Sequence, residues 1–274
     1  MTPSNDPDSS LLRLQDWYRS PLGQAVAARE SDCVKEMLSD LFGYYLVQIG
    51  ATDRFADALA ACRIRHSVLL PCRAPSGRPG LEIIGHPARL PLASDEIDAV
   101  LLPHTLDFAP DPRQVLREVE RVLIPEGRVF ILGFNALSTW GLRAALHRLG
   151  SARRRRVPWC GRFLTPFRVE DWLSLLGFDV EDRDHIVFLP PFRRALDSRF
   201  GALDRLGGRF WSPMGGVYVI RAVKRVATLT PLRPSWAARR ALLPGGAIEP
   251  SARGGLSSRD REMGAGTVDA RVLR

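Results

Sequence analysis

The sequence predicts an α/β fold: a doubly wound, mostly parallel sheet with helices on both faces. Segments 97–102 and 129–132 are continuous apolar runs, which are typical of parallel strands covered on both faces. Between them, residues 115–123 place their apolar side chains on one face of a helix. Together the three segments predict a strand–helix–strand unit, and such units build parallel sheets.

The helix of this unit has clear sequence signals at both ends. Asp111 is a good N-cap residue, Pro112 suits the first helical position, and Gln114 has the spacing of a capping box. Residues 124–127, Ile-Pro-Glu-Gly, have proline second and glycine last, which predicts a turn before the next strand.

The elements before this unit are less sharply marked. Residues 1–9 are polar and are expected to be disordered. Two helices are predicted at 10–20 and 21–41, and the core-facing positions of the second are Leu22, Val26, Val34, Met37, Leu38 and Leu41. Further expected elements are a strand at 44–49, a helix at 53–62, and short strands at 67–70 and 81–84.

After the unit, a helix is predicted at 137–149 with Ser138 as its cap, and another begins after Thr165 and ends at Gly177. The last two strands are expected at 178–188 and 217–223, with a long insert at 189–216 between them. From residue 230 the chain is rich in Gly, Pro, Ser, Ala and Arg, and a disordered tail is expected over 230–274. The sequence thus predicts one domain, residues 10–229.

Composition limits the possible partners. The net charge of +9 and the isoelectric point of about 10.2 raise nucleic acid as a partner. However, nearly all basic residues are arginine, with only Lys35 and Lys224 as lysines, and many lie in the tail. The sequence has no apolar run long enough to span a membrane and starts with a polar segment, so a cytoplasmic protein is expected. The four cysteines are scattered, which argues against a metal site.

The segment 89–134 also resembles a known family. It has Leu-Pro at 90–91, a histidine at 104, Asp-Pro at 111–112, and the run Leu-Arg-Glu-Val-Glu-Arg-Val-Leu followed by Pro and Gly at 116–127. This wording is similar to the small-molecule branch of the class I S-adenosylmethionine-dependent methyltransferases. The resemblance implies a sheet of seven strands with the last one antiparallel, a methyltransferase activity, and S-adenosyl-L-methionine as the cofactor.

Aligned on the resemblance, the cofactor site would lie at the ends of the first strands. Gln48, Gly50 and Ala51 take the place of the family's acid and glycines, and Pro71 stands where the family usually has an acid that binds the ribose. His86 replaces the family's aspartate before Leu-Pro, followed by Pro87, while Pro103 ends the fourth strand. These polar contacts are substituted, so an inactive protein that retains the fold is an alternative to an active enzyme.

Catalysis of methyl transfer depends mainly on holding the acceptor in line with the methyl group, with a base needed for some acceptors. His104 is the first candidate for a base or for orienting the acceptor, and Asp107 is the second. Asn135 and Trp140 either line an acceptor pocket or, the favoured alternative, serve the turn and the core. The acceptor is expected to be a small molecule, and an RNA-associated methyltransferase is a further alternative.

The insert offers one more hypothesis. Residues 191–211 have apolar side chains at helical spacing with arginines on other faces. Such a basic amphipathic helix can bind a membrane surface, although packing on its own domain is the commoner role. Arg153–Arg156 are expected in a solvated loop.

Overall fold

The computed structural model describes residues 7–50, 55–71, 81–149, 158–188, 190–191 and 214–226. The chain divides into two units, residues 1–228 and 229–274, and all the described residues belong to the first. The predicted tail, the loop at 153–156, Ala51 and nearly all of the 191–211 segment lie outside the described residues.

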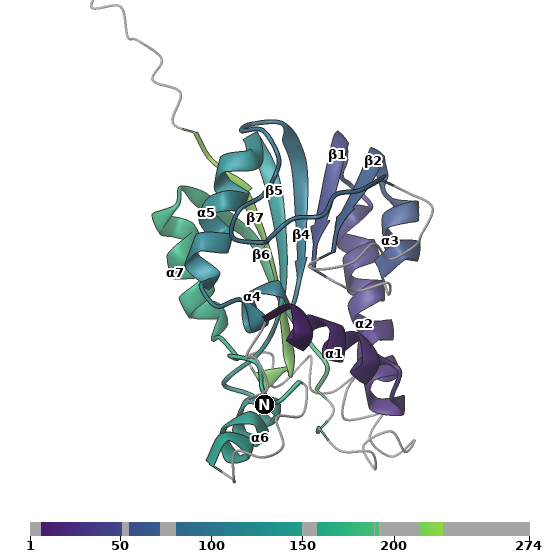
Figure 1. The fold of residues 1–274 in the computed structure, drawn as a ribbon, viewed down its shortest axis with the longest axis vertical. Helices are drawn as coiled ribbons and strands as arrows, with labels where there is room; N and C mark the ends of the chain where they lie inside the picture. Colours follow the sequence, from purple (N-terminus) through teal and green to yellow (C-terminus); the bar gives the residue numbers. More distant parts are fainter. Residues whose placement is uncertain are drawn as a thin grey trace, which may run out of the picture. The chain divides into compact units, whose positions relative to one another are not determined.

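The sheet has seven strands in the order β3-β2-β1-β4-β5-β7-β6 (Figure 1). The strands β1 to β5 pair in parallel, and β7 is antiparallel to both β5 and β6. The predicted doubly wound, mostly parallel sheet is therefore confirmed. The strands are β1 (Phe42–Ile49), β2 (Arg63–Leu70), β3 (Leu81–Glu82), β4 (Ile97–Pro103), β5 (Leu123–Phe134), β6 (Phe178–Ile186) and β7 (Val217–Lys224).

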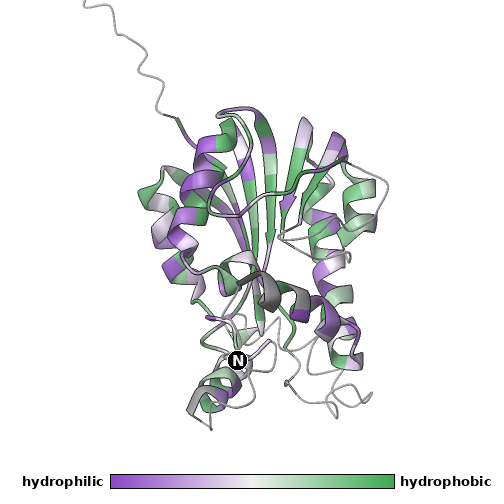
Figure 2. Cartoon of the chain, in the orientation of Figure 1, coloured by the Kyte–Doolittle hydropathy of each residue, from purple (hydrophilic) through white to green (hydrophobic). Residues whose placement is uncertain are grey.

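Helices cover both faces of this sheet (Figure 1). On one face lie α5 (Pro112–Val122) and α7 (Pro166–Leu175), and on the other lie α2 (Pro21–Leu38) and α3 (Ala56–Ala61). At the carboxyl ends of the parallel strands lie α1 (Pro7–Tyr18), the short α4 (Thr105–Phe108) and α6 (Thr139–Leu149). Figure 2 shows the strands predominantly hydrophobic, as expected of strands covered on both faces.

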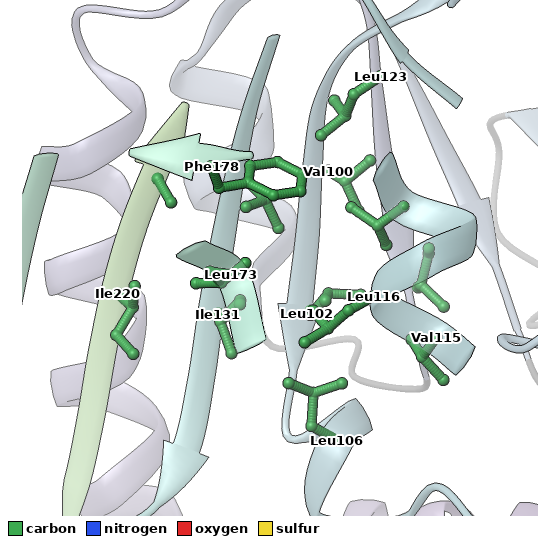
Figure 3. Close-up of a cluster of buried hydrophobic side chains, with 14 of the residues drawn as sticks. Val100, Leu102, Leu106, Val115, Leu116, Leu123, Ile131, Leu173, Phe178 and Ile220 are labelled. Atoms are coloured by element: carbon green, nitrogen blue, oxygen red, sulfur yellow. The ribbon is translucent and has the colours of Figure 1, made fainter. Parts of the chain in front are cut away.

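The core is built as the periodicity predicts. The apolar face of α5 packs with β4, β5 and α7, including Leu102, Val115, Leu116 and Ile131 (Figure 3). On the opposite face, the six positions predicted to point inward from 21–41 are all buried. These residues are Leu22, Val26, Val34, Met37, Leu38 and Leu41.

The predicted helix caps are confirmed. The Asp111 side chain accepts hydrogen bonds from the backbone N–H groups of Arg113 and Gln114, so it caps α5. Ser138 caps α6 through the N–H groups of Trp140 and Gly141. Thr165 caps α7, and Gly177 follows its end with a φ of 82°.

Two local predictions need correction, and one short helix was not predicted. Residues Pro7–Ser9 belong to α1 rather than to a disordered terminus. The helix α4 was not predicted, because four residues are too few to show a period. Residues 124–127 form no separate turn: β5 already starts at Leu123, and these residues bulge between two pairs with β4, with Glu126 at a φ of 64°.

Candidate functional site

The carboxyl ends of β1, β2 and β4 lie side by side, because β1 is hydrogen-bonded to both neighbours. Ile49 pairs with Leu70, and the N–H of Gly50 donates to the carbonyl of Leu70 at 3.2 Å. The strand order changes direction between β1 and β4, where open α/β sheets bind ligands. The structure therefore brings Gly50, Pro71 and Pro103 to the edge at which the sequence placed a cofactor.

The backbone at Gly50 lies close to the residues that follow β4. Its φ is 109°, a conformation that residues with a side chain rarely adopt. A Cβ atom here would lie 2.8 Å from the Thr105 hydroxyl oxygen and 3.6 Å from the Pro103 carbonyl oxygen. That hydroxyl is itself held, because it donates to the carbonyl of Ile49 at 2.5 Å. Only glycine therefore fits this position without strain.

The loop before β4 lies beside a small cavity next to Thr105. This cavity of about 10 Å³ lies between His86, Pro87 and Thr105. His86 is exposed, and its Nδ1 accepts a hydrogen bond from the N–H of Ala88 at 3.1 Å. A neutral His86 ring therefore carries its proton on Nε2, where it is a donor.

Gln48 lies further inside the molecule. It is 1% exposed and is the second-last residue of β1, paired with Leu69 and Leu101. Since side chains alternate along a strand, it shares the face of Leu46, which packs toward α2 and α3. Gln48 is thus buried in the sheet, whereas His86 is exposed and lines the small cavity together with Pro87.

A buried polar network begins where β4 ends. His104 has a φ of 56° and no exposed surface. Its Nδ1 lies 3.0 Å from Oδ2 of Asp107, and its Nε2 lies 2.9 Å from Oε1 of Glu30 on α2. The Tyr18 hydroxyl on α1 donates to Oε2 of Glu30 at 2.7 Å. The network therefore joins both N-terminal helices to the end of β4.

Further donors meet both carboxyl groups. The Asp107 oxygen that meets His104 also accepts from the N–H of Phe134 at 2.9 Å, and Glu30 accepts from Tyr18. With both carboxyl groups ionised, each accepts a hydrogen bond from His104, and the ring then donates from both nitrogens as an imidazolium. The ring of Phe134 stacks on it, with centroids 4.1 Å apart.

The pKa values agree with this assignment. Burial by itself would lower the pKa of His104, but the charge of Glu30 and the hydrogen bonds from Asp107 and Glu30 outweigh it and raise the pKa to about 9. Burial raises the pKa of Asp107, and the contacts with His104 and the Phe134 N–H oppose that rise. At neutral pH one buried cation is therefore shared by two carboxyl groups.

This geometry gives the two candidate catalytic residues a defined place. His104 and Asp107 contact each other, but both are buried, and both ring nitrogens of His104 lie within hydrogen-bond distance of a carboxyl group. Asn135 and Trp140 are also buried: Asn135 bonds the Gly215 carbonyl and the Leu137 N–H, and Trp140 stacks with Phe134. The favoured structural role of Asn135 and Trp140 is confirmed.

Two members of this network were missed in the sequence. Glu30 and Tyr18 precede β1 and match no motif. The sequence nevertheless places Glu30 on the buried face of α2. The apolar residues of this face recur every four positions, at Leu22, Val26, Val34 and Leu38, and Glu30 lies at the one position of the series that is not apolar. A lone acid on a buried helix face requires a partner.

Comparisons with known proteins agree with the fold. Residues 39–131 match a family model described as a methyltransferase domain. The chain is 33% identical over 174 residues to the uncharacterized protein YafS of Escherichia coli, covering 64% of this chain and 69% of YafS. It is 32% identical over 181 residues to the uncharacterized protein Rv2003c of Mycobacterium tuberculosis, covering 64% of this chain and 60% of that protein.

Solved structures share the architecture. A SAM-dependent methyltransferase from Thermotoga maritima superposes with a TM-score of 0.58 at 21% identity, covering 80% of this chain and 98% of that one. A methyltransferase from Haloferax volcanii, solved with its Trm112 activator, gives a TM-score of 0.57 at 14% identity, covering 82% of this chain and 100% of that one. At such identities these likenesses show the fold alone. Together with the family match and the relatives, they show that the chain belongs to the class I S-adenosylmethionine-dependent methyltransferase family.

Proposed function

We propose that this protein transfers a methyl group from S-adenosyl-L-methionine to a small-molecule acceptor. The observation that carries this proposal is Gly50, held at a φ of 109° against the end of β4 at the point where the strand order changes direction. Such a close backbone approach after the first strand is what a nucleoside-bearing cofactor needs in sheets of this type.

The residues at this edge fit the cofactor in part. Gly50 would lie against it, Pro71, Pro87 and Pro103 would provide apolar walls, and His86 would donate from Nε2 to a ring nitrogen of the adenine. An acid after β2, which would bind the ribose, is absent from the sequence between Pro71 and Gly80. The bound cofactor supplies an electrophilic methyl group on sulfur, and the chain supplies its position.

For His104 and Asp107 we propose a positioning role in place of direct proton transfer. Their network with Glu30 and Tyr18 ties α1 and α2 to the end of β4. Methyl transfer depends mainly on a fixed alignment of acceptor and donor. Helices held firmly at the carboxyl ends of the strands would therefore support the reaction. His104 would have to break its contact with Glu30 before its Nε2 could contact a methyl acceptor.

Calorimetric titration with S-adenosyl-L-methionine tests the cofactor proposal. We expect binding, and we expect His86→Ala to weaken it about threefold to tenfold, the effect of one hydrogen bond. His66→Ala is the matched control. His66 is also exposed, but it lies in the middle of β2, paired with Tyr45 of β1 and away from the carboxyl ends of the strands. No binding at millimolar cofactor would refute the proposal.

A second candidate is a methyltransferase-fold protein without activity. It is favoured by the buried imidazolium of His104, which offers no free nitrogen for proton transfer. Incubation with isotopically labelled donor and cell extract, followed by mass spectrometry, separates the two: a labelled product supports the enzyme. Cofactor binding without any labelled product supports the inactive protein.

A further inference from the structure

A second concave surface lies between the starts of α5 and α7. It is a cleft of about 480 Å³, a size typical of small-molecule sites. Three arginines, Arg113, Arg162 and Arg168, line it together with Trp172, and proline and leucine side chains complete its walls. We call these four residues the arginine cleft.

Trp172 organises the arginine cleft. The guanidinium carbons of Arg113 and Arg168 lie over its ring, 5.0 and 5.2 Å from the centroid. The indole is only 6% exposed, so it is a fixed support rather than a mobile surface side chain. These cation–π contacts position both guanidinium groups, whose N–H groups can still bind other partners.

Among the described residues, the three cleft arginines make none of the ion pairs that other arginines of the fold form. Arg121, Arg128 and Arg183 each pair with a glutamate at 2.9 to 3.1 Å. Within the described part of the chain, no carboxylate lies in ion-pair distance of the three cleft guanidinium groups. Asp111 also lines the cleft, but its carboxylate caps α5.

We infer that the arginine cleft binds the phosphate or diphosphate group of a small ligand. Three exposed, unpaired guanidinium groups around one concave surface match an anion with several oxygens, and arginine is suited to bidentate contact with phosphate. A volume of about 480 Å³ is typical of sites for small ligands, so we assign a small anion to the cleft.

The location of the cleft gives this anion a role. Pro110 lines both the arginine cleft and the small cavity beside His86 and Pro87. The backbone N–H of Arg162 also donates to the carbonyl of Asp107 in α4 at 2.6 Å, and α4 directly follows the end of β4. The cleft would thus hold the anionic end of the methyl acceptor; this assignment of the ligand as the acceptor rests on the proposed function, whereas anion binding does not.

Calorimetric titration of the full chain with pyrophosphate, without any cofactor, tests the inference. We expect saturable binding that weakens as salt rises, with each of Arg113→Gln and Arg162→Gln lowering the affinity about tenfold. Arg117→Gln is the matched control: it is exposed on the same helix, removes the same charge and lies outside the cleft. Equal affinities for all three variants, or no binding by the unmodified protein, would overturn the inference.

Further titrants identify the anion. Citrate binding as tightly as pyrophosphate, with the same dependence on the arginines, would overturn the assignment to phosphate. Binding of a labelled RNA oligonucleotide that needs Arg113 and Arg162, with no binding of pyrophosphate, would replace the small ligand by nucleic acid. Because none of these titrations contains S-adenosyl-L-methionine, their failure is distinct from failure of the proposed function.

Discussion

Glu30 and His104 are separated by 74 residues in the sequence, yet Oε1 of Glu30 lies 2.9 Å from Nε2 of His104, and neither side chain has exposed surface. One residue comes from a helix before the sheet and the other from the end of its central strand. Two charged groups buried in this way must remain paired, because an isolated charge in the interior is costly. The pair therefore links the position of α2 to the carboxyl edge of the sheet.

The first prediction concerns this pair. Glu30→Gln keeps the shape of the side chain but removes its charge, leaving a buried imidazolium with one partner fewer. We expect the free energy of unfolding to fall by about 3 to 5 kcal/mol in urea denaturation. Glu36→Gln, an exposed change on the same helix, should have little effect. Equal stabilities of the two variants would show that Glu30 and His104 do not form a charged pair.

The second prediction concerns pH. The pKa of His104 is raised from 6.5 to about 9, so its contribution to stability is fully present below about pH 6.5 and is lost as pH rises through 9. A shift of this size corresponds to about 3 kcal/mol at most. NMR titration of the ring protons should find His104 titrating near pH 9, with His104→Asn assigning its signal.

His185 provides the contrast for that titration, because burial and the nearby Arg183 lower its pKa. The two histidines should therefore depart from the ordinary value in opposite directions. A ring at position 104 that titrates below pH 6.5 would contradict the imidazolium assignment.

The third prediction concerns Gly50. Gly50→Ala meets both an unfavourable φ of 109° and the Thr105 hydroxyl at 2.8 Å, so we expect a loss of about 3 kcal/mol in urea denaturation. Gly177→Ala has a φ of 82° but no contact closer than 3.6 Å, so it should cost about 1 kcal/mol. Adding Thr105→Ala to Gly50→Ala should recover part of the loss. Equal costs at the two glycines would rule out the close approach at Gly50.

The fourth prediction concerns Glu118 and Arg121, two residues of the sequence motif at 116–123. Arg121 donates to the carbonyls of Leu90 and Leu92 at 3.0 and 2.9 Å, while Glu118 accepts from the Leu90 N–H and pairs with Arg121. Together they hold the loop that carries the Leu-Pro sequence. We expect Arg121→Met to lower stability by about 2 kcal/mol, since two carbonyls lose a charged donor.

Arg117→Met on the exposed side of α5 is the control, and a change below about 0.5 kcal/mol is expected there. Thermal or urea denaturation of both variants checks this comparison. If Arg121→Met were as stable as Arg117→Met, the motif would need another explanation.

The sequence by itself determined the order of the elements around β4, α5 and β5. It did so because the signals are local: apolar runs mark buried strands, a 3.6-residue period marks the inner face of α5, and Asp111 or Thr165 can cap only the helix that follows it. The edge that holds Gly50 and Pro103 was predictable too, since parallel strands direct their carboxyl ends to one side.

Only the tertiary structure decided which side chains meet there. The sequence placed His104 at the end of a strand, but its burial and its partner Glu30 depend on how α2 packs over the sheet. Likewise, Arg113 and Arg168 share Trp172 only because α5 and α7 cover the same face. Periodicity records which face of an element is buried, whereas contacts between distant segments arise from packing, which no local pattern encodes.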